Sequence, residues 1–242
     1  MSPRVLVLFA REPRRQALEK GLAAESGASL FAAFARDWID GATACGAKVF
    51  IATPPDDRAA WRRALPDSRF AFLEQRGRSL GERLEDAARQ AAADGACVVL
   101  VGGDVAPSPR SLAAAFELRE RGNDAVVAPA RDGGVSLVAL AEDDLDLLGR
   151  FVPRRSDVFR NLSATLSFRR RRIAVVSAVG DVDGRRELGR MLRTTAFPVP
   201  GLRALARAVL EEDRWNRGLF RPTSPTSPDV DAPVSRGPPV AA

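Results

Sequence analysis

A run of apolar, largely β-branched residues that ends in two glycines and a carboxylate stands out in the chain. Residues 96–104 read ACVVLVGGD, which is typical of a parallel strand buried on both faces. Ligands of open α/β sheets bind beyond the carboxyl ends of such strands, so Asp104 is predicted to lie in a binding cleft. Gly102 and Gly103 would let a ligand or metal approach the backbone closely. By residue type alone, Asp104 as a turn or helix cap is an equally good interpretation.

The chain contains no histidine, which excludes several common catalytic and metal-binding systems. Nucleophile systems that pair serine or cysteine with histidine are excluded, and so are the usual zinc sites. The two cysteines, Cys45 and Cys97, lack a metal-binding spacing and lie in apolar stretches. They are expected to be buried free thiols, as is usual in a reducing cytoplasm.

The net charge of +6 comes almost wholly from arginine, since the only lysines are Lys20 and Lys48. Its sign fits an anionic ligand such as a phosphate, although arginine enrichment across a whole chain is more typical of genomic base composition. The arginines are scattered and only 6% of residues are aromatic, so no nucleic-acid partner is expected. The apolar run near residues 4–10 is too short for export or membrane insertion. The protein is therefore expected to be cytoplasmic, without membrane insertion.

Strands and helices are predicted to alternate along the first half of the chain. Besides the run before Asp104, strands are expected at residues 4–10, 48–53, 70–75, 124–129, 134–141 and 173–179. Helices are expected at residues 26–46, 56–65, 80–94, 109–121, 157–168, 185–192 and 202–217, with a brief helical piece at 145–149. Residues 11–25 are expected to form a charged loop. The four arginines at 169–172 are interpreted as a solvated strand entry rather than a phosphate patch.

These unit lengths are typical of βαβ connections and predict an α/β fold with helices on both faces of a mostly parallel sheet. The neighbouring strands around Asp132 add an antiparallel element, so the sheet is expected to be mixed. Residues 1–220 are expected to form one domain. The Pro- and Ser-rich residues 221–242 are expected to form a disordered tail.

Five motifs occur in a definite order. They are VLVLFAREP near the start, QRGRSLGER from Gln75, VVLVGGDVAPSP around Asp104, APARDGGVSLVAL around Asp132 and GDVDGRREL from Gly180. This ordered set resembles a small bacterial family of GT-A-fold nucleotide-diphospho-sugar transferases, often described as radical-SAM- or selenodomain-associated glycosyltransferases and related to phospholactate guanylyltransferases. The resemblance covers residues 5–188. It implies a GT-A, Rossmann-like three-layer α/β/α sandwich with a mixed, mostly parallel sheet.

The resemblance implies that Asp104 and Asp183 hold a divalent metal, Mg²⁺ or Mn²⁺, against a nucleotide diphosphate. Such metals are typically held by one or two carboxylates plus phosphate oxygens, and they neutralise the leaving diphosphate. Asp104 and Asp132 are the expected catalytic residues, and Gly133 and Gly134 are expected to face the acceptor. By residue type alone, Asp132 and Gly133 are an ordinary turn signal.

Asp183 belongs to an Asp-x-Asp pair with Asp181, which has two interpretations. The resemblance allows the second aspartate to complete the metal site. Alternatively, both carboxylates could simply begin the following helix, since acidic groups favour helix N-termini.

Nucleotide-binding residues are implied in three places: the first strand end with its loop, the Gln75 motif, and the glycine pair before Asp104. They are Phe9, Ala10, Arg11, Arg14, Arg15, Lys20, Gln75, Gly77, Leu80, Gly81, Arg83, Gly102 and Gly103. The glycines and Arg83 would lie at a helix N-terminus, which favours anions. A capping box of Ser79 and Glu82 beside a solvated Arg83 is the competing interpretation.

The first loop departs from the family pattern. Where the family has a lysine and an arginine expected to contact phosphates, this chain has Glu19 and Gly21. A carboxylate there would repel a diphosphate, but Arg14, Arg15 or Lys20 could substitute from a shifted loop. The family's proline after the metal aspartate is displaced to Pro107, its tyrosine is replaced by Val135, and its Trp-Ser pair is Arg155-Ser156 here.

Two classes of function follow. The first is a metal-dependent glycosyltransferase that binds a nucleotide-diphospho-sugar above Asp104 and passes the sugar to an unknown acceptor. Nucleotidyl transfer on the same scaffold is a related alternative, because both reactions need positioning and charge neutralisation around a diphosphate. The second class is a catalytically degenerate binding or regulatory protein, favoured by the altered loop. If the protein assembles, a homodimer is the expected form.

Overall fold

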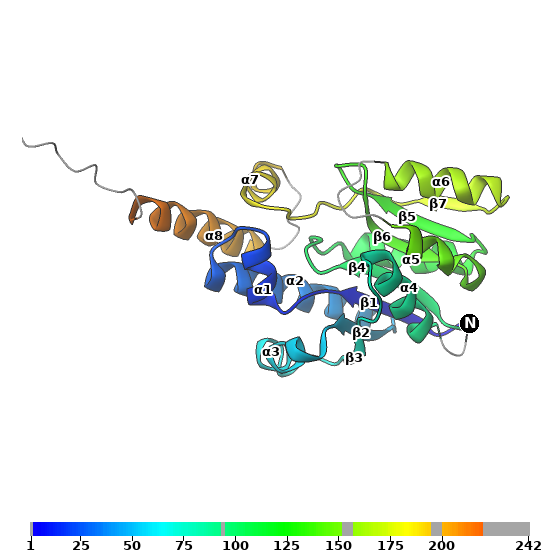
Figure 1. Ribbon diagram of the computed structural model, residues 1–242, viewed down its shortest axis with the longest axis horizontal. Helices are drawn as coiled ribbons and strands as arrows, with labels where there is room; N and C mark the ends of the chain where they lie inside the picture. The colour runs from blue at the N-terminus through cyan, green and yellow to red at the C-terminus, as the bar shows by residue number, and fades with distance from the viewer. Residues whose placement is uncertain (1, 93–94, 152–156, 195–199, 220–242) are drawn as a thin grey trace, which may run out of the picture.

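The computed structural model describes residues 2–92, 95–151, 157–194 and 200–219. A seven-stranded sheet runs through it in the order β3-β2-β1-β4-β6-β5-β7, from the lower edge to the upper edge in Figure 1. Its strands are β1 (Arg4–Phe9), β2 (Lys48–Thr53), β3 (Ala71–Glu74), β4 (Cys97–Gly102), β5 (Ala125–Pro129), β6 (Val135–Leu140) and β7 (Ile173–Val175).

All strands except β6 run in the same direction. The pairs β1 with β2, β1 with β4, β2 with β3 and β5 with β7 are parallel, and β6 is antiparallel to both β4 and β5. The prediction of a mixed, mostly parallel sheet is therefore confirmed. Because parallel strands end at the same edge, the segments that follow β1, β4, β5 and β7 can meet there.

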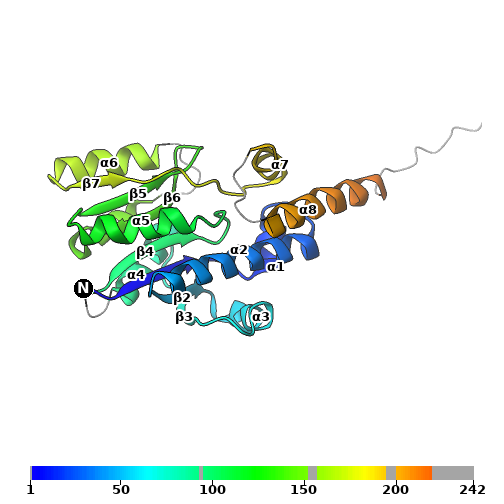
Figure 2. The same cartoon turned by 180° about the vertical axis from the view of Figure 1, so that it is seen from behind.

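Helices cover both faces of this sheet. Their bounds are α1 (Pro13–Glu19), α2 (Ala24–Ala44), η1 (Pro55–Asp57), α3 (Arg58–Ala64), α4 (Leu80–Ala91), α5 (Pro109–Glu120), η3 (Glu142–Arg150), α6 (Val158–Phe168), α7 (Arg185–Arg193) and α8 (Pro200–Leu219). The helices α2, α3 and α5 pack on one face, and α4, η3 and α6 pack on the other (Figures 1 and 2). The expected three-layer α/β/α arrangement is confirmed.

Alternate residues of β1 and β4 are buried on opposite faces. Leu6 and Leu8 pack with Trp38 and Phe116 on the α2 and α5 side, whereas the residues between them face α4. Both faces are covered, which is why these strands are continuous apolar runs rather than alternating ones.

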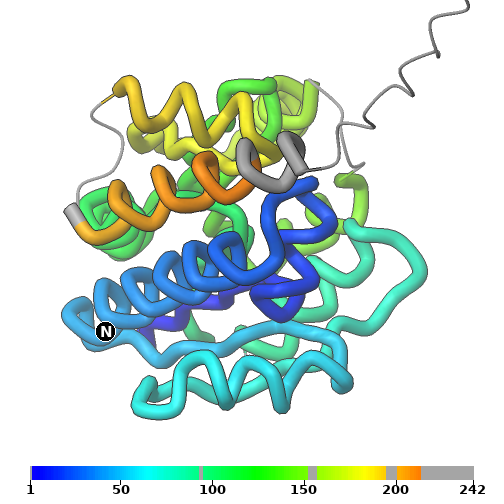
Figure 3. Tube along the Cα trace, turned by 90° about the vertical axis from the view of Figure 1, so that its left-hand side faces the viewer, coloured from blue at the N-terminus to red at the C-terminus, as the bar shows by residue number. Residues whose placement is uncertain are grey.

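A third apolar cluster lies beyond the sheet edge and joins α1, α2, α7 and α8. It includes Phe31 and Phe34 of α2, Val182, and Met191 of α7. In Figure 3, α8 (orange) lies alongside α2 (blue), with α7 (yellow) on its other side. This cluster secures the segment after β7 against the first half of the chain, because Val182 is fully buried in it.

Two expected elements differ in the structure. Residues 11–25 are not a plain loop, since Pro13–Glu19 forms α1. Glu12 caps this helix by accepting hydrogen bonds from the backbone N–H groups of Arg14 and Arg15. The last strand is shorter than residues 173–179, because β7 ends at Val175.

Two arginines of the four-arginine run, Arg169 and Arg171, pair with carboxylates, whereas Arg170 is exposed as expected. Arg169 donates from Nη1 to the buried carboxylate of Asp144 at 2.9 Å, and Arg171 lies 2.7 Å from its other oxygen. Arg169 also donates to Asp146. Because Asp144 and Asp146 belong to η3, the run fastens η3 to the end of α6.

Several expectations fall on residues outside those described. These are the Arg155-Ser156 pair and residues 221–242. Within the described ranges, no helix is both long enough and apolar enough to span a membrane.

The close contact between α4 and η3 yields a test of packing. A Cβ atom at Gly81 would lie 2.5 Å from the carbonyl oxygen of Gly149. We expect Gly81→Ala to lower the free energy of unfolding, measured by urea denaturation, by about 1–3 kcal/mol because the contact becomes overpacked.

Gly201→Ala is the matched control, since Gly201 is also the second residue of its helix and a Cβ there meets no heavy atom within 4 Å. This control should leave stability unchanged or raise it by up to about 1 kcal/mol. Equal losses in the two variants would contradict the packing argument.

Candidate functional site

Asp104 follows β4 at the carboxyl edge of the sheet, where the backbones of two loops come close together. The N–H of Gly103 donates to the carbonyl of Phe9 at 2.9 Å. A Cβ atom at Gly103 would collide with Ala10, and one at Gly102 would lie 2.7 Å from the Asp104 carboxylate. Both glycines are therefore needed for the approach of this loop to the end of β1 and for the orientation of Asp104.

The segment after β7 runs back along the Asp104 loop. Val105 and Asp181 form an antiparallel bridge. The N–H of Ala106 donates to the backbone carbonyl of Gly180, and the N–H of Val182 donates to the backbone carbonyl of Asp104, each at 2.9 Å. Successive side chains of extended backbone point to opposite sides, so Val182 enters the core and leaves the flanking carboxylates on the other side.

Asp132 lies in the turn between β5 and β6. Gly133 has φ +89°, a conformation that glycine adopts readily. The N–H of Gly134 donates to Oδ1 of Asp132 at 2.9 Å, which forms an Asx turn that orients the carboxylate. The turn is further tied to α6, because the N–H of Phe159 donates to the carbonyl of Gly133.

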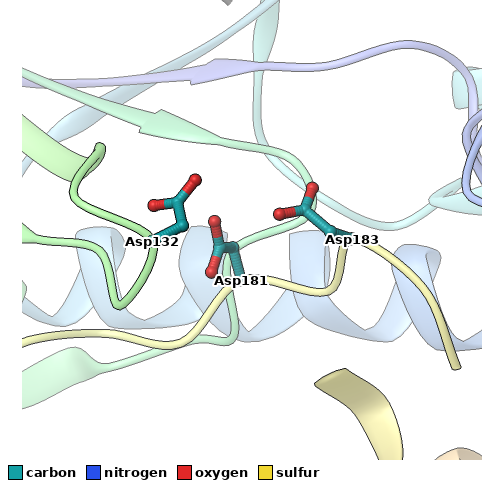
Figure 4. A group of neighbouring side chains, drawn as sticks. All are labelled: Asp132, Asp181 and Asp183. Atoms are coloured by element: carbon teal, nitrogen blue, oxygen red, sulfur yellow. The ribbon is translucent and has the colours of Figure 1, made fainter. Parts of the chain in front are cut away.

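The carboxylates of Asp132, Asp181 and Asp183 meet at one point. One oxygen of each lies within 4.8 Å of the other two, and Figure 4 shows Asp132 on the β5–β6 turn and the other two on the segment after β7. Burial raises the pKa of Asp181 to about 6, helped by the charges of Asp183, Asp104 and Asp132. The three carboxylates suit a hard divalent cation such as Mg²⁺ or Mn²⁺, which prefers oxygen ligands.

Lys20, the residue that caps the C-terminus of α1, contributes positive charge to this cluster. Its Nζ lies 2.5 Å from Oδ2 of Asp104 and 2.5 Å from Oδ1 of Asp183. Although burial lowers the pKa of Lys20, the two carboxylates hold it above its usual value. No other described cationic side chain forms an ion pair with these two aspartates.

The arginines of the first loop have other partners. Arg11 and Arg15 lie within 4 Å of the carboxylates of Glu19 and Asp57, and Arg14 pairs with Glu25. Glu19 thus pairs with neighbouring arginines, and the charged group beside Asp104 is Lys20.

The Gln75 motif lies beyond β3 and leads into α4. Gln75 donates to the carbonyls of Ala52 at 2.8 Å and Ala10 at 3.3 Å, so it connects the ends of β1 and β2. Gly77 has φ +130°. Arg83 donates to the carbonyl of its own helix cap, Ser79.

The capping interpretation of this motif agrees with the structure. Ser79 accepts a hydrogen bond from the backbone N–H of Glu82, and the Glu82 carboxylate accepts one from the N–H of Arg78. Leu80 and Gly81 form the first turn of α4, where Gly81 packs on η3. The assignment of these residues to nucleotide binding stays a prediction.

The structure groups the predicted metal ligands differently from the sequence motifs. Asp183 lies in the carboxylate triad, whereas Asp104 is bound to Lys20. Asp181 and Asp132 complete the triad, and neither aspartate of the Asp-x-Asp pair caps α7, whose N-cap is Gly184. The Asp-Val-Asp alternation was the available signal for Asp181, since an apolar residue between two carboxylates in extended backbone places both on one side.

Comparison with protein families shows a match over residues 40–162 to the family model DUF2064, described as an uncharacterized protein conserved in bacteria. The matched stretch includes Asp104 and Asp132 and ends before Asp181. No protein with a curated description matches the sequence at a significant level.

Solved structures share the fold. A proposed nucleotide-diphospho-sugar transferase from Desulfovibrio desulfuricans G20 is 25% identical, with a TM-score of 0.74 over 89% of this chain and 98% of its own. Rv0371c from Mycobacterium tuberculosis H37Rv, in complex with manganese, is 17% identical, with a TM-score of 0.51 over 80% of this chain and 100% of its own. UTP-bound UGPase from Acinetobacter baumannii is 10% identical, with a TM-score of 0.54 over 87% of this chain and 99% of its own. The last two show the fold alone.

The raised pKa of Asp181 predicts a gain in stability when its charge is removed. In the folded protein the carboxylate titrates near pH 6, whereas in the unfolded chain it titrates near its ordinary value of about 4. Ionised Asp181 therefore opposes folding fully above pH 6, and this opposition disappears below pH 4, where both states are protonated. In EDTA at pH 8, Asp181→Asn should raise the free energy of unfolding by about 1–2 kcal/mol, a value reduced for partial solvent exposure.

Urea denaturation at pH 8 and pH 4 provides the measurement. Asp67→Asn, which removes a charge from an exposed loop after α3, serves as the control and should change stability little. A gain at Asp181 of equal size at both pH values would show that charge is not its cause.

Proposed function

Because the chain belongs to the DUF2064 family of bacterial proteins and has the fold of nucleotide-sugar transferases, we propose that it is a metal-dependent nucleotide-diphospho-sugar transferase. In this proposal the donor's diphosphate binds beside Lys20 and the triad of Asp132, Asp181 and Asp183. The sugar passes to an acceptor that lies near Gly133 and Gly134.

The observation that carries this proposal is the meeting of three carboxylates and a lysine at the carboxyl edge of the sheet. The triad comes from two loops that are far apart in sequence, and its oxygens lie within 4.8 Å of one another. This donor set fits Mg²⁺ or Mn²⁺. Such a metal would neutralise charge on the leaving diphosphate.

The chain's own groups would supply the rest of the binding energy and orientation. The Lys20 ammonium is a strong donor to phosphate oxygens, and Asp104 aligns it through the 2.5 Å ion pair. Asp132 is held by its Asx turn beside Gly133 and Gly134, so besides its place in the triad it would face the acceptor. The loop from Gln75 to Arg83 would border the nucleotide, and Phe9, Ala10, Gly102 and Gly103 would form the floor of the site.

Nucleotidyl transfer would use the same groups, and the products distinguish the two reactions. Sugar transfer releases a nucleoside diphosphate, whereas nucleotidyl transfer from a triphosphate releases pyrophosphate. A non-catalytic binding role is favoured by one observation only, namely that Arg11 and Arg15 already pair with Glu19 and Asp57.

Calorimetric titration tests the proposal directly. Nucleoside diphosphates and UDP-, GDP- and dTDP-sugars are titrated with and without Mn²⁺ into the wild type, Asp104→Ala, Asp181→Asn and Asp183→Asn. We expect one nucleotide class to bind in a Mn²⁺-dependent manner. Each aspartate variant should weaken that binding by about tenfold or more, because each removes a charge from the site.

Asp67→Asn is again the control and should bind as the wild type does. Absence of binding across the whole panel would contradict the transferase proposal and favour the non-catalytic role. Binding that does not depend on Mn²⁺ or on the triad would contradict the proposed metal site.

A further inference from the structure

Lys20 pairs with a carboxylate that a divalent cation in the triad would also use. Its ammonium lies 2.5 Å from Asp183, and Asp183 is also a member of the carboxylate triad. An ammonium and a metal ion at the same carboxylate repel each other, and this repulsion is large where the groups are partly shielded from water. A metal that binds alone must therefore tolerate Lys20 or displace it.

The Lys20 side chain can also move away from Asp183. Its head group is carried by a flexible four-carbon stem. Its backbone is held at the end of α1, where its N–H donates to the carbonyl of Gln16 at 3.1 Å, and its carbonyl oxygen lies next to Gly184, the residue after Asp183. The side chain can therefore turn from Asp183 to a nearby anion without movement of α1. A diphosphate bound to the metal would be such an anion.

We propose that Lys20 couples the binding of the metal to the binding of the nucleotide. In the free protein it holds Asp104 and Asp183 together as their counterion. When a metal and a nucleoside diphosphate bind together, the ammonium exchanges Asp183 for a phosphate oxygen, and Asp183 becomes available to the metal. This inference rests on the proposed function, because it takes the triad as the metal site.

The charges of Lys20, the metal and the diphosphate lead us to expect that neither ligand binds well alone. Without nucleotide, the Lys20 ammonium neutralises part of the negative charge of Asp183 and repels the metal. Without metal, the carboxylates around Lys20 repel a diphosphate. Together the two ligands compensate each other, which is positive coupling between sites; such coupling typically changes affinity by about 5- to 150-fold.

The experiment measures Mn²⁺ affinity by EPR, with free Mn²⁺ followed directly, in the absence and presence of UDP, GDP, CDP, ADP and dTDP in turn. For the wild type, the effective nucleotide should tighten Mn²⁺ binding by about tenfold or more. In Lys20→Met, Mn²⁺ alone should bind about tenfold more tightly than to the wild type, and the nucleotide should add little. Lys20→Arg keeps the positive charge and should retain weak binding of the metal alone.

The matched control is Lys48→Met, which removes the only other lysine, an exposed residue at the start of β2. It should behave as the wild type does. Circular dichroism checks that each variant is folded. If Lys20→Met does not fold, the wild type and Lys20→Arg still test the coupling. Equal Mn²⁺ affinity with and without every nucleotide in the wild type would show that the two ligands are not coupled.

The outcomes separate this inference from the proposed function. If the wild type binds Mn²⁺ tightly through Asp181 without nucleotide, and Lys20→Met does not bind it more tightly, the role of Lys20 is wrong while the metal site stands. If Mn²⁺ does not bind under any condition, including in Lys20→Met, the metal site is wrong and the inference falls with it.

Discussion

The candidate site depends on the backbone pairing of two segments that are far apart in sequence. The bridge between Val105 and Asp181, with hydrogen bonds on either side of it, fastens the end of the β4 segment to the segment after β7. Carboxylates brought together in this way repel one another, so the energy that holds them must come from elsewhere. It comes from the burial of apolar side chains such as Val105 and Val182, whose transfer from water is favourable, and from paired backbone groups.

The acidic cluster shows a conflict between stability and the capacity to bind. Burial and neighbouring charge raise the pKa of Asp181 to about 6, which means that its ionised form disfavours folding at neutral pH. Lys20 relieves part of this repulsion through its contacts with Asp104 and Asp183. Groups arranged against folding in this way are frequent at functional sites, where selection retains them for binding or chemistry.

The sequence predicts the scaffold better than the site because the two depend on different ranges of interaction. Strands β1 and β4 are recognisable from local apolar runs. Helix α1 is not, because its buried residues, Pro13, Gln16 and Ala17, produce no apolar period. Its local signals are Pro13 at the first helical position after Glu12 and a run of charge, and both also suit a loop.

The site requires knowledge of contacts between distant residues. Nothing near Asp132 in the sequence indicates that it meets Asp181, and the position of Lys20 depends on the helix that local patterns miss. The ion pairs of the arginine run at 169–172 are missed for a similar reason. The partners Asp144 and Asp146 lie more than 20 residues earlier and are brought close only by the fold.

The hydrogen bond from the indole of Trp38 to the carbonyl of Val105, 3.0 Å long and buried, joins α2 to the residue that follows Asp104. Indole emission responds to the polarity and hydrogen bonding around the ring. A change in the backbone at Asp104 would therefore reach a chromophore in the core, and the protein carries an intrinsic optical reporter of its own acidic loop.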